Sequence, residues 1–187
     1  PINCHDPGDS VGLLVPCGEI KIVNENNREV KQGETGELWI KGPMVVPGYW
    51  KNVKATKDSF DKGYWKSGDI ASQDENGFIR IHDRKKDMIN RGGYKIFSAE
   101  IENLIMLMDE VQEAALVPYP CPILGERSHA FVFSLSTAVD PNKIRLQLSR
   151  KVADYKVPDK ITITQEPLPR NVNGKITKAP LKDIAGK

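Results

Sequence analysis

The chain has 187 residues, with 27 Lys and Arg against 25 Asp and Glu, so its formal net charge is +2. Hydrophobic residues make up 39% and charged residues 28%, which excludes a collagen-like, disordered or coiled-coil chain. The small net charge argues against a general nucleic-acid-binding protein. No apolar run approaches the roughly 20 residues of a transmembrane segment. The three cysteines, Cys4, Cys17 and Cys121, form no C-x-x-C pair, so we expect no disulfide framework, no metal site and a cytoplasmic location.

Residues 1–82 are predicted to be rich in β-strands. Short apolar segments alternate with turn-forming residues, and strands are expected over residues 12–16, 19–23 and 37–41. The segment Asp74-Glu75-Asn76-Gly77 predicts a reverse turn, because Asn-Gly accepts the positive φ of tight hairpins. That turn joins a strand ending near Ala71 to one over residues 78–82. We expect a small antiparallel sheet or barrel.

Residues 83–187 combine helices and strands. A first helix, with Ser98 as its expected cap, is predicted from apolar residues spaced i, i+3, i+4 and i+7: Ile101, Leu104, Ile105 and Met108. Strands are expected over residues 114–117, 130–135 and 160–164. A second helix begins with Asp140 as cap and Pro141 in the first position, and its inward residues are Ile144, Leu148 and Val152. A short helix follows Pro180. The fold class is therefore α+β, a β-rich subdomain followed by a small α+β domain.

The predicted boundary between the two domains, 1–82 and 83–187, is the charged run Asp83-Arg84-Lys85-Lys86-Asp87. Hydrophilic connections commonly accommodate domain motion. A charged run of this kind is, on general grounds, more often a solvated turn.

Three segments carry candidate functional residues. Asp69, in the sequence Tyr64-Trp65-Lys66-Ser67-Gly68-Asp69, suits a ribose diol, because a carboxylate accepts two hydrogen bonds; the ordinary alternative is a turn aspartate that bonds its own backbone. Gly92 and Gly93 let a ligand approach the backbone, and residues 83–95 hold five basic and two acidic side chains. Lys175 follows Asn173-Gly174, a turn that would place its ammonium group on a constrained loop, although most lysines are simply solvated.

The order of these motifs resembles the C-terminal portion of the adenylate-forming superfamily, which includes acyl-CoA synthetases, peptide synthetase adenylation domains and luciferases. Within it the chain looks most like an acyl-CoA synthetase of the long-chain-fatty-acid–CoA ligase type. The motifs that carry the resemblance span most of the chain: Gly33-Glu34-Thr35-Gly36-Glu37-Leu38, Pro47-Gly48-Tyr49-Trp50, Ser67-Gly68-Asp69, residues 83–102, and Asn173-Gly174-Lys175-Ile176.

The resemblance implies an enzyme that activates a carboxylic acid with MgATP as an acyl-adenylate and then transfers the acyl group to a thiol. By similarity, Asp69 binds the ribose hydroxyls of ATP, Arg84 approaches the nucleotide, and Lys86 is a hinge between domains. Gly92, Gly93 and Lys95 match the pantetheine channel, where basic side chains, including Arg91, would favour the phosphates of CoA. Lys175 matches the lysine that bridges the carboxylate and the α-phosphate.

The sequence contains no counterpart of the family's phosphate loop, acyl pocket or Mg²⁺ ligands, which belong to a large N-terminal region. We therefore expect a fragment that is inactive alone, with residues 1–82 closing the large domain and residues 83–187 forming the mobile one. Its expected partners are the carboxylic acid, ATP/AMP, CoA or carrier-protein pantetheine, and the N-terminal domain. Two alternatives remain: an aryl-acid or amino-acid adenylating domain that loads a carrier protein, or a non-catalytic nucleotide- or partner-binding module. His82 and His129 are expected to be structural.

Overall fold

The computed structural model describes residues 8–186, in two compact units that divide after Lys86. This division lies four residues beyond the boundary expected from the sequence, because strand β5 (Ile79–Arg84) runs past His82. The end of this strand stays bonded to the first unit, since Lys85 N donates to Gly68 O at 2.8 Å. Of the three cysteines, Cys17 and Cys121 are free thiols, and Cys4 lies outside the described residues.

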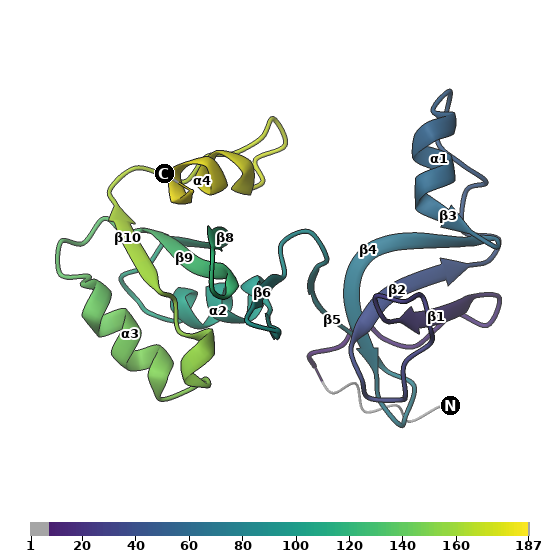
Figure 1. The fold of residues 1–187 in the computed structure, drawn as a ribbon, viewed down its shortest axis with the longest axis horizontal. Helices are drawn as coiled ribbons and strands as arrows, with labels where there is room; N and C mark the ends of the chain where they lie inside the picture. The colour runs from purple at the N-terminus through teal and green to yellow at the C-terminus, as the bar shows by residue number, and fades with distance from the viewer. Residues whose placement is uncertain (1–7, 187) are drawn as a thin grey trace. The chain divides into compact units, whose positions relative to one another are not determined.

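Unit 1 is a five-stranded antiparallel sheet with one short helix. In chain order its elements are β1 (Glu19–Val23), β2 (Gly36–Lys41), α1 (Val53–Ser59), β3 (Phe60–Asp61), β4 (Tyr64–Gln73) and β5. The long β4 is strongly curved and pairs with β2, β3 and β5 (Figure 1). The core of this unit is formed by Ile22, Leu38, Ala71 and Ile79. The predicted antiparallel sheet is therefore confirmed.

Local patterns in unit 1 are mostly confirmed. Strands appear at residues 19–23 and 36–41, and Asp74 Oδ1 accepts hydrogen bonds from the backbone N–H groups of Asn76 and Phe78 in the predicted turn. The strand expected over residues 12–16 is wrong. Only its start exchanges backbone hydrogen bonds with Ile79, and the side chains of Leu13 and Val15 stay exposed, so the segment has no buried face.

Unit 2 is a second five-stranded sheet with helices on both faces. Its elements are β6 (Ile89–Arg91), β7 (Tyr94–Ile96), α2 (Ser98–Met106), β8 (Glu113–Cys121), β9 (Gly125–Phe133), α3 (Pro141–Ser149), the 3₁₀ turn η1 (Asp154–Lys156), β10 (Lys160–Thr164) and α4 (Lys178–Ala185). The strand order is β10-β9-β6-β7, and β8 also pairs with β9. β10 runs parallel to β9, while the other pairs are antiparallel. The predicted α+β class is confirmed.

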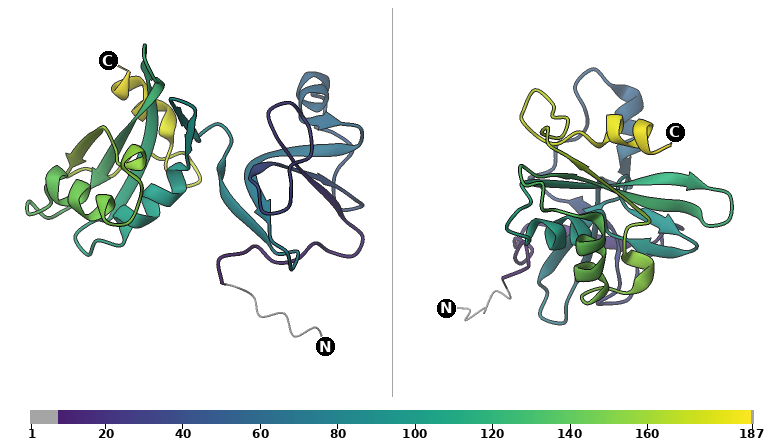
Figure 2. Two further views of the ribbon diagram at one scale, coloured as in Figure 1. Left: turned by 60° about the horizontal axis from the view of Figure 1, so that its bottom comes forward. Right: turned by 90° about the vertical axis from the view of Figure 1, so that its left-hand side faces the viewer.

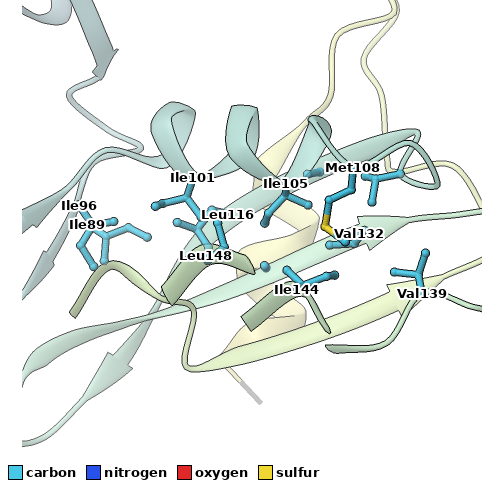
Figure 3. Packing of buried hydrophobic residues seen from close by; sticks show 13 residues of the cluster. Ile89, Ile96, Ile101, Ile105, Met108, Leu116, Val132, Val139, Ile144 and Leu148 are labelled. Atoms are coloured by element: carbon cyan, nitrogen blue, oxygen red, sulfur yellow. The ribbon is translucent and has the colours of Figure 1, made fainter. Parts of the chain in front are cut away.

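The two faces of β8 and β9 fill two different cores. Successive side chains of a strand point to opposite faces. One set packs under α2 and α3: Ala114, Leu116, Ala130 and Val132, with Ile101, Ile105, Ile144 and Leu148 from the helices (Figure 3). The other set packs under α4: Ala115, Val117, Phe131 and Phe133, with Leu181 and Ala185 from the helix (Figure 2).

The helix ends show where local patterns suffice. Asp140 caps α3 as predicted, because its Oδ1 accepts from the N–H of Asn142 at 3.1 Å and Pro141 follows. The Ser98 cap of α2 is wrong: Phe97 is the cap residue, with no side-chain hydrogen bond, and the buried Ser98 hydroxyl accepts from Lys178 Nζ at 2.7 Å. α4 begins at Lys178, before Pro180, because a proline in the first turn costs no intrahelical hydrogen bond.

We predict that Leu148→Ala lowers the free energy of unfolding of unit 2 by about 2–5 kcal/mol, because the buried isopropyl group is lost and a cavity remains. Leu148 is 2% exposed, whereas Leu146 on the same helix is 55% exposed. Leu146→Ala is therefore the matched control and should change stability little. Native-state hydrogen exchange of the β9 amides measures the free energy of unfolding of unit 2 separately from that of unit 1. Equal effects of the two substitutions would contradict the packing described.

Candidate functional site

Asp69 and Arg84, the two residues expected at the nucleotide, lie together in unit 1. They are directly opposed on β4 and β5, and Arg84 Nε lies 3.0 Å from Asp69 Oδ1. Arg84 also donates to the carbonyl of Ser67 at 3.3 Å. The side chain of Asp69 is 23% exposed and that of Arg84 is 59% exposed, so both remain accessible to a ligand. Their pairing depends on the Asp74 turn, which brings the two strands together.

The strand geometry around this pair is irregular. The register shifts between Ile70 and Ala71, which pair with Asp83 and Ile81 respectively, so His82 is the extra residue of a bulge. Bulges re-aim neighbouring side chains and are frequent beside functional sites. Ser67 Oγ accepts a hydrogen bond from Asp69 N at 3.0 Å, which fixes the backbone of Asp69. The turn-aspartate alternative is thus replaced by an ion pair held across two strands.

Lys86 is exposed and lies in the turn over residues 85–87, at the point where the two units divide. Its predecessor Lys85 is bound to unit 1, with Nζ 2.9 Å from Glu37 Oε2. Its successor Asp87 is bound to unit 2, with Oδ1 3.2 Å from Lys182 Nζ. The residue expected as a hinge is therefore flanked by one residue fixed in each unit.

Gly92 and Gly93 form the two-residue turn between β6 and β7. Their φ values of +61° and +88° match a type I′ hairpin, which favours glycine at both positions. Gly92 N donates to Leu124 O at 2.8 Å, and Gly93 N donates to Asn90 Oδ1 at 3.1 Å. A Cβ at Gly93 would meet no atom within 4 Å, so this side of the turn is open to a ligand. Lys95 lies half-buried on β7, opposite Asn90.

Arg91, beside this turn, is committed to Asp159. Its Nη2 lies 3.0 Å from Asp159 Oδ1 and its Nε 3.3 Å from Oδ2, and Asp159 also accepts from Ser128 N at 3.1 Å. Burial alone would raise the pKa of Asp159, but the hydrogen bonds from Arg91 and Ser128 lower it overall. The hydrogen bond from Arg91 to Asp159 raises the pKa of the guanidinium. The expectation that Arg91 serves the phosphates of CoA is therefore not favoured by its geometry.

Lys175 lies at the end of a tight hairpin loop. Gly174 N donates to Asn171 O at 2.9 Å, and Gly174 has φ +77°, the geometry of a type I turn followed by a glycine bulge. Asn171 Oδ1 accepts from Asn173 N and Lys175 N, each at 3.0 Å. Lys175 is exposed, and no acidic side chain pairs with it within residues 8–186. The structure thus presents an unneutralised ammonium group on an ordered loop.

His82 and His129 each lie beside a hydroxyl. His82 Nε2 is 2.8 Å from Ser72 Oγ, and His129 Nε2 is 2.8 Å from Thr162 Oγ1. Burial first, and the charge of Lys160 second, lower the pKa of His129. Within residues 8–186 no cluster of three or more His, Cys, Asp or Glu side chains is placed to hold a metal ion. None of the described helices is long and apolar enough to cross a membrane.

Sequence reasoning missed the partners of the candidate residues. Asp159 for Arg91, Glu37 for Lys85 and Glu113 for Arg170 all come from distant segments. Each is an acidic residue in or beside a predicted strand, which is an uncommon location for an unpaired carboxylate. That was the available signal, although it does not identify the partner.

Comparison with known proteins gives two family matches. The family "AMP-binding enzyme" matches residues 2–50, and "AMP-binding enzyme C-terminal domain" matches residues 100–175, which ends at Lys175. A long-chain-fatty-acid–CoA ligase from Salmonella typhimurium is 40% identical over 98% of this chain and 33% of its own length. The chain therefore spans about a third of the length of the curated relatives it matches.

Solved structures agree in fold. The o-succinylbenzoate CoA synthetase MenE from Bacillus subtilis, in complex with its acyl-adenylate intermediate, is 30% identical with a TM-score of 0.87, over 95% of this chain and 36% of its own. ATP-bound MatB from Rhodopseudomonas palustris is 31% identical with a TM-score of 0.84, over 94% of this chain and 35% of its own. Both units thus have counterparts in enzymes solved with a nucleotide bound.

The pKa of Asp159 gives a pH-dependent prediction for the glycine turn. Since its folded pKa is below its unfolded value of about 3.9, the pair stabilises unit 2 above about pH 4, and this stabilisation is lost as the pH falls through the lowered folded pKa. Asp159→Asn should therefore cost on the order of 2 kcal/mol of unfolding free energy at pH 7. At pH 3 the difference from wild type should be smaller.

Urea unfolding followed by circular dichroism at the two pH values measures this difference. Glu110→Gln is the matched control, because Glu110 forms an exposed ion pair with Lys143 and should contribute much less. A loss for Asp159→Asn that does not change between pH 7 and pH 3 would contradict the assignment.

Proposed function

Because the chain belongs to the AMP-binding enzyme family, we propose that it is the C-terminal part of an ATP-dependent acid:thiol ligase. Such an enzyme forms an acyl-adenylate and pyrophosphate from ATP and a carboxylic acid, and then transfers the acyl group to the thiol of CoA. The observation that carries the proposal is the exposed Lys175, which has no acidic partner within residues 8–186. It is the last residue matched by the family "AMP-binding enzyme C-terminal domain". The isolated 187 residues are expected to be inactive.

Asp69 and Arg84 are proposed to bind the nucleotide. Arg84 occupies Oδ1 of the carboxylate, and the carboxylate can accept further hydrogen bonds from the two ribose hydroxyls. The guanidinium is planar and largely exposed, so its free N–H groups can donate to the ribose or phosphate oxygens. The ion pair keeps both groups in one orientation before the nucleotide arrives, which reduces the entropic cost of binding.

Lys175 is proposed to stabilise the adenylation transition state. The carboxylate of the acid attacks the α-phosphate, so two anions approach and negative charge increases on the phosphoryl oxygens. An ammonium group placed at that position offsets the repulsion, and it is most effective where water is excluded. A lysine on a mobile chain end would lose conformational entropy when it is ordered during the reaction, whereas the hairpin already orders the backbone of Lys175.

The glycine turn and Lys86 are proposed to serve the second step. The open face of Gly93 can admit a narrow pantetheine arm, with Gly92 required by the turn and Lys95 close to the expected phosphates of CoA. Lys86 is proposed as the hinge that lets unit 2 serve the two steps in turn. In this proposal residues 1–82 close the large AMP-binding domain and residues 83–187 form its mobile C-terminal domain.

The described residues do not fit a magnesium site, since they hold no cluster of acidic side chains suited to the ion. We therefore assign no step of this chain's chemistry to Mg²⁺ and place its ligands in the N-terminal region. The proposed acid is a long-chain fatty acid and the proposed acceptor is free CoA, following the relatives. The free thiols of Cys17 and Cys121 support a cytoplasmic enzyme.

The proposed reaction is tested with the complete enzyme that contains this chain. Carboxylate-dependent exchange of pyrophosphate into ATP should appear with fatty acids and be absent with aryl and amino acids. Formation of acyl-CoA should then follow when CoA is added. Exchange limited to amino or aryl acids would contradict the substrate class, and absence of exchange from folded enzyme that binds ATP would contradict the reaction.

The role of Lys175 is tested by separating the two half-reactions. Lys175→Ala should lower the adenylation rate by about 10²–10³-fold, because it removes a positive charge required as charge builds up on the phosphate. Thioester formation from a supplied acyl-adenylate should be largely unchanged. Lys143→Ala is the matched control, because it removes a lysine of an exposed ion pair elsewhere in unit 2 and should leave both half-reactions unchanged. Equal loss in both half-reactions for Lys175→Ala would refute the assignment.

A further inference from the structure

The loop that carries Lys175 is closed at its base by the sheet of unit 2. Leu168 and Ile176 flank the loop and pack against the cluster under α4. Thr177 N donates to Pro169 O at 2.7 Å, and Arg170 and Ile176 form an isolated β-bridge. The two ends of the loop are therefore fixed.

The peptide bond between Gly174 and Lys175 is held at both ends. Its N–H, which belongs to Lys175, donates to Asn171 Oδ1 at 3.0 Å. Its carbonyl, which belongs to Gly174, accepts a hydrogen bond from the guanidinium of Arg170. The carbonyl of Lys175 in turn accepts from Asn171 N at 2.9 Å. Since backbone groups on both sides of the Lys175 Cα are fixed, the direction in which its side chain leaves the loop is fixed as well.

Arg170 connects this peptide bond to the sheet. The same guanidinium that binds Gly174 O donates through Nη2 to Glu113 Oε1, at the first residue of β8. Glu113 Oε2 accepts from Leu168 N at 2.8 Å, so the carboxylate holds the loop at two places. Its side chain is only 12% exposed. Burial alone would raise the pKa of Glu113, but the bonds from Arg170 and Leu168 N lower it overall.

We infer that Glu113 and Arg170 form a positioning pair that sets the direction of Lys175 for the adenylation step. The inference rests on the proposed function of Lys175. Neither residue needs to touch the substrate, because the pair acts through the Gly174–Lys175 peptide bond. A planar guanidinium suits this role, since it can donate to a carboxylate and to a carbonyl at once while a lysine offers a single point charge.

The inference predicts a selective kinetic defect. In the complete enzyme, Arg170→Met keeps an apolar stem but removes every donor, and should lower the adenylation rate constant about 10- to 100-fold, with the KM for ATP nearly unchanged. Thioester formation from a supplied acyl-adenylate should stay at the wild-type rate. Arg170→Lys and Glu113→Gln each keep part of the bridge and should give smaller defects in the same half-reaction. Lys143→Met, which breaks an exposed ion pair elsewhere in unit 2, is the control.

A double substitution tests whether the pair acts through Lys175. If it does, Arg170→Met should lower the residual adenylation of the Lys175→Ala enzyme by no more than about twofold, since the group being positioned is already absent. A further loss as large as that in wild type would overturn the inference. A wild-type adenylation rate for Arg170→Met would overturn it too.

Hydrogen exchange separates this inference from the proposed function, because it needs no activity. In the 187-residue chain, Arg170→Met should speed amide exchange at residues 170–176 and leave β8 and β9 as protected as in wild type. Unchanged exchange in the loop would overturn the inference, even in an active enzyme. Faster exchange in the loop, together with a complete wild-type enzyme that forms no adenylate, would support the anchoring of Lys175 and overturn the proposed reaction alone.

Discussion

The pairing of β8 with β9 is the constraint on which unit 2 depends. Nine consecutive residue pairs join the two strands, from Glu113 with Phe133 to Cys121 with Gly125. Both faces are buried over residues 114–117 and 130–133, so a shift of one residue would move these side chains into the opposite core. The Lys175 loop is held at one end of this pair through Glu113, and the glycine turn at the other through Gly125, which pairs with Arg91. At about 3.4 Å per residue the two ends are roughly 27 Å apart. If both have the roles proposed, Lys175 and the glycine turn are too far apart to contact the same reacting group at once, so they contact it in successive steps.

Unit 1 uses a different device to prepare its candidate residues. Asp69 and Arg84 come together because the Asp74 turn folds β4 against β5, and the bulge at His82 changes the register just before the pair. Without the bulge, the register of Ser72 with Arg80 would continue and would place Asp69 opposite Asp83. Two carboxylates directly opposed on one face would repel each other, so the extra residue determines whether Asp69 meets a cation or an anion.

Local physical rules predicted the parts of the fold that local contacts determine. The Asp74 turn and the Asp140 cap each depend on hydrogen bonds between neighbours within a few residues. The Ser98 cap failed because a distant group decided it: the ammonium of Lys178 reaches the Ser98 hydroxyl and also Glu102, whose carboxylate accepts from Leu116 N. Spacing along the chain contains no information on such contacts. The same holds for the site, where the sequence identified candidate groups but not the distant carboxylates Glu37, Glu113 and Asp159.

The basic segment around the domain boundary shows why charge counts mislead. Residues 83–95 look like a surface for phosphates, yet Arg84, Lys85 and Arg91 are each ion-paired with a carboxylate of their own unit. These pairs reduce the positive charge that the sequence presented as available for a polyanion, which weakens the alternative of a module that binds a partner through this loop. Arg84 keeps exposed guanidinium N–H groups for the nucleotide in its proposed role. Lys175 has no acidic partner within residues 8–186, whereas Arg170 and Lys178 of the same segment are paired with Glu113 and Glu102. A cation is most useful to a reaction where the fold orders its backbone and leaves its charge unpaired, and the Lys175 loop meets both conditions.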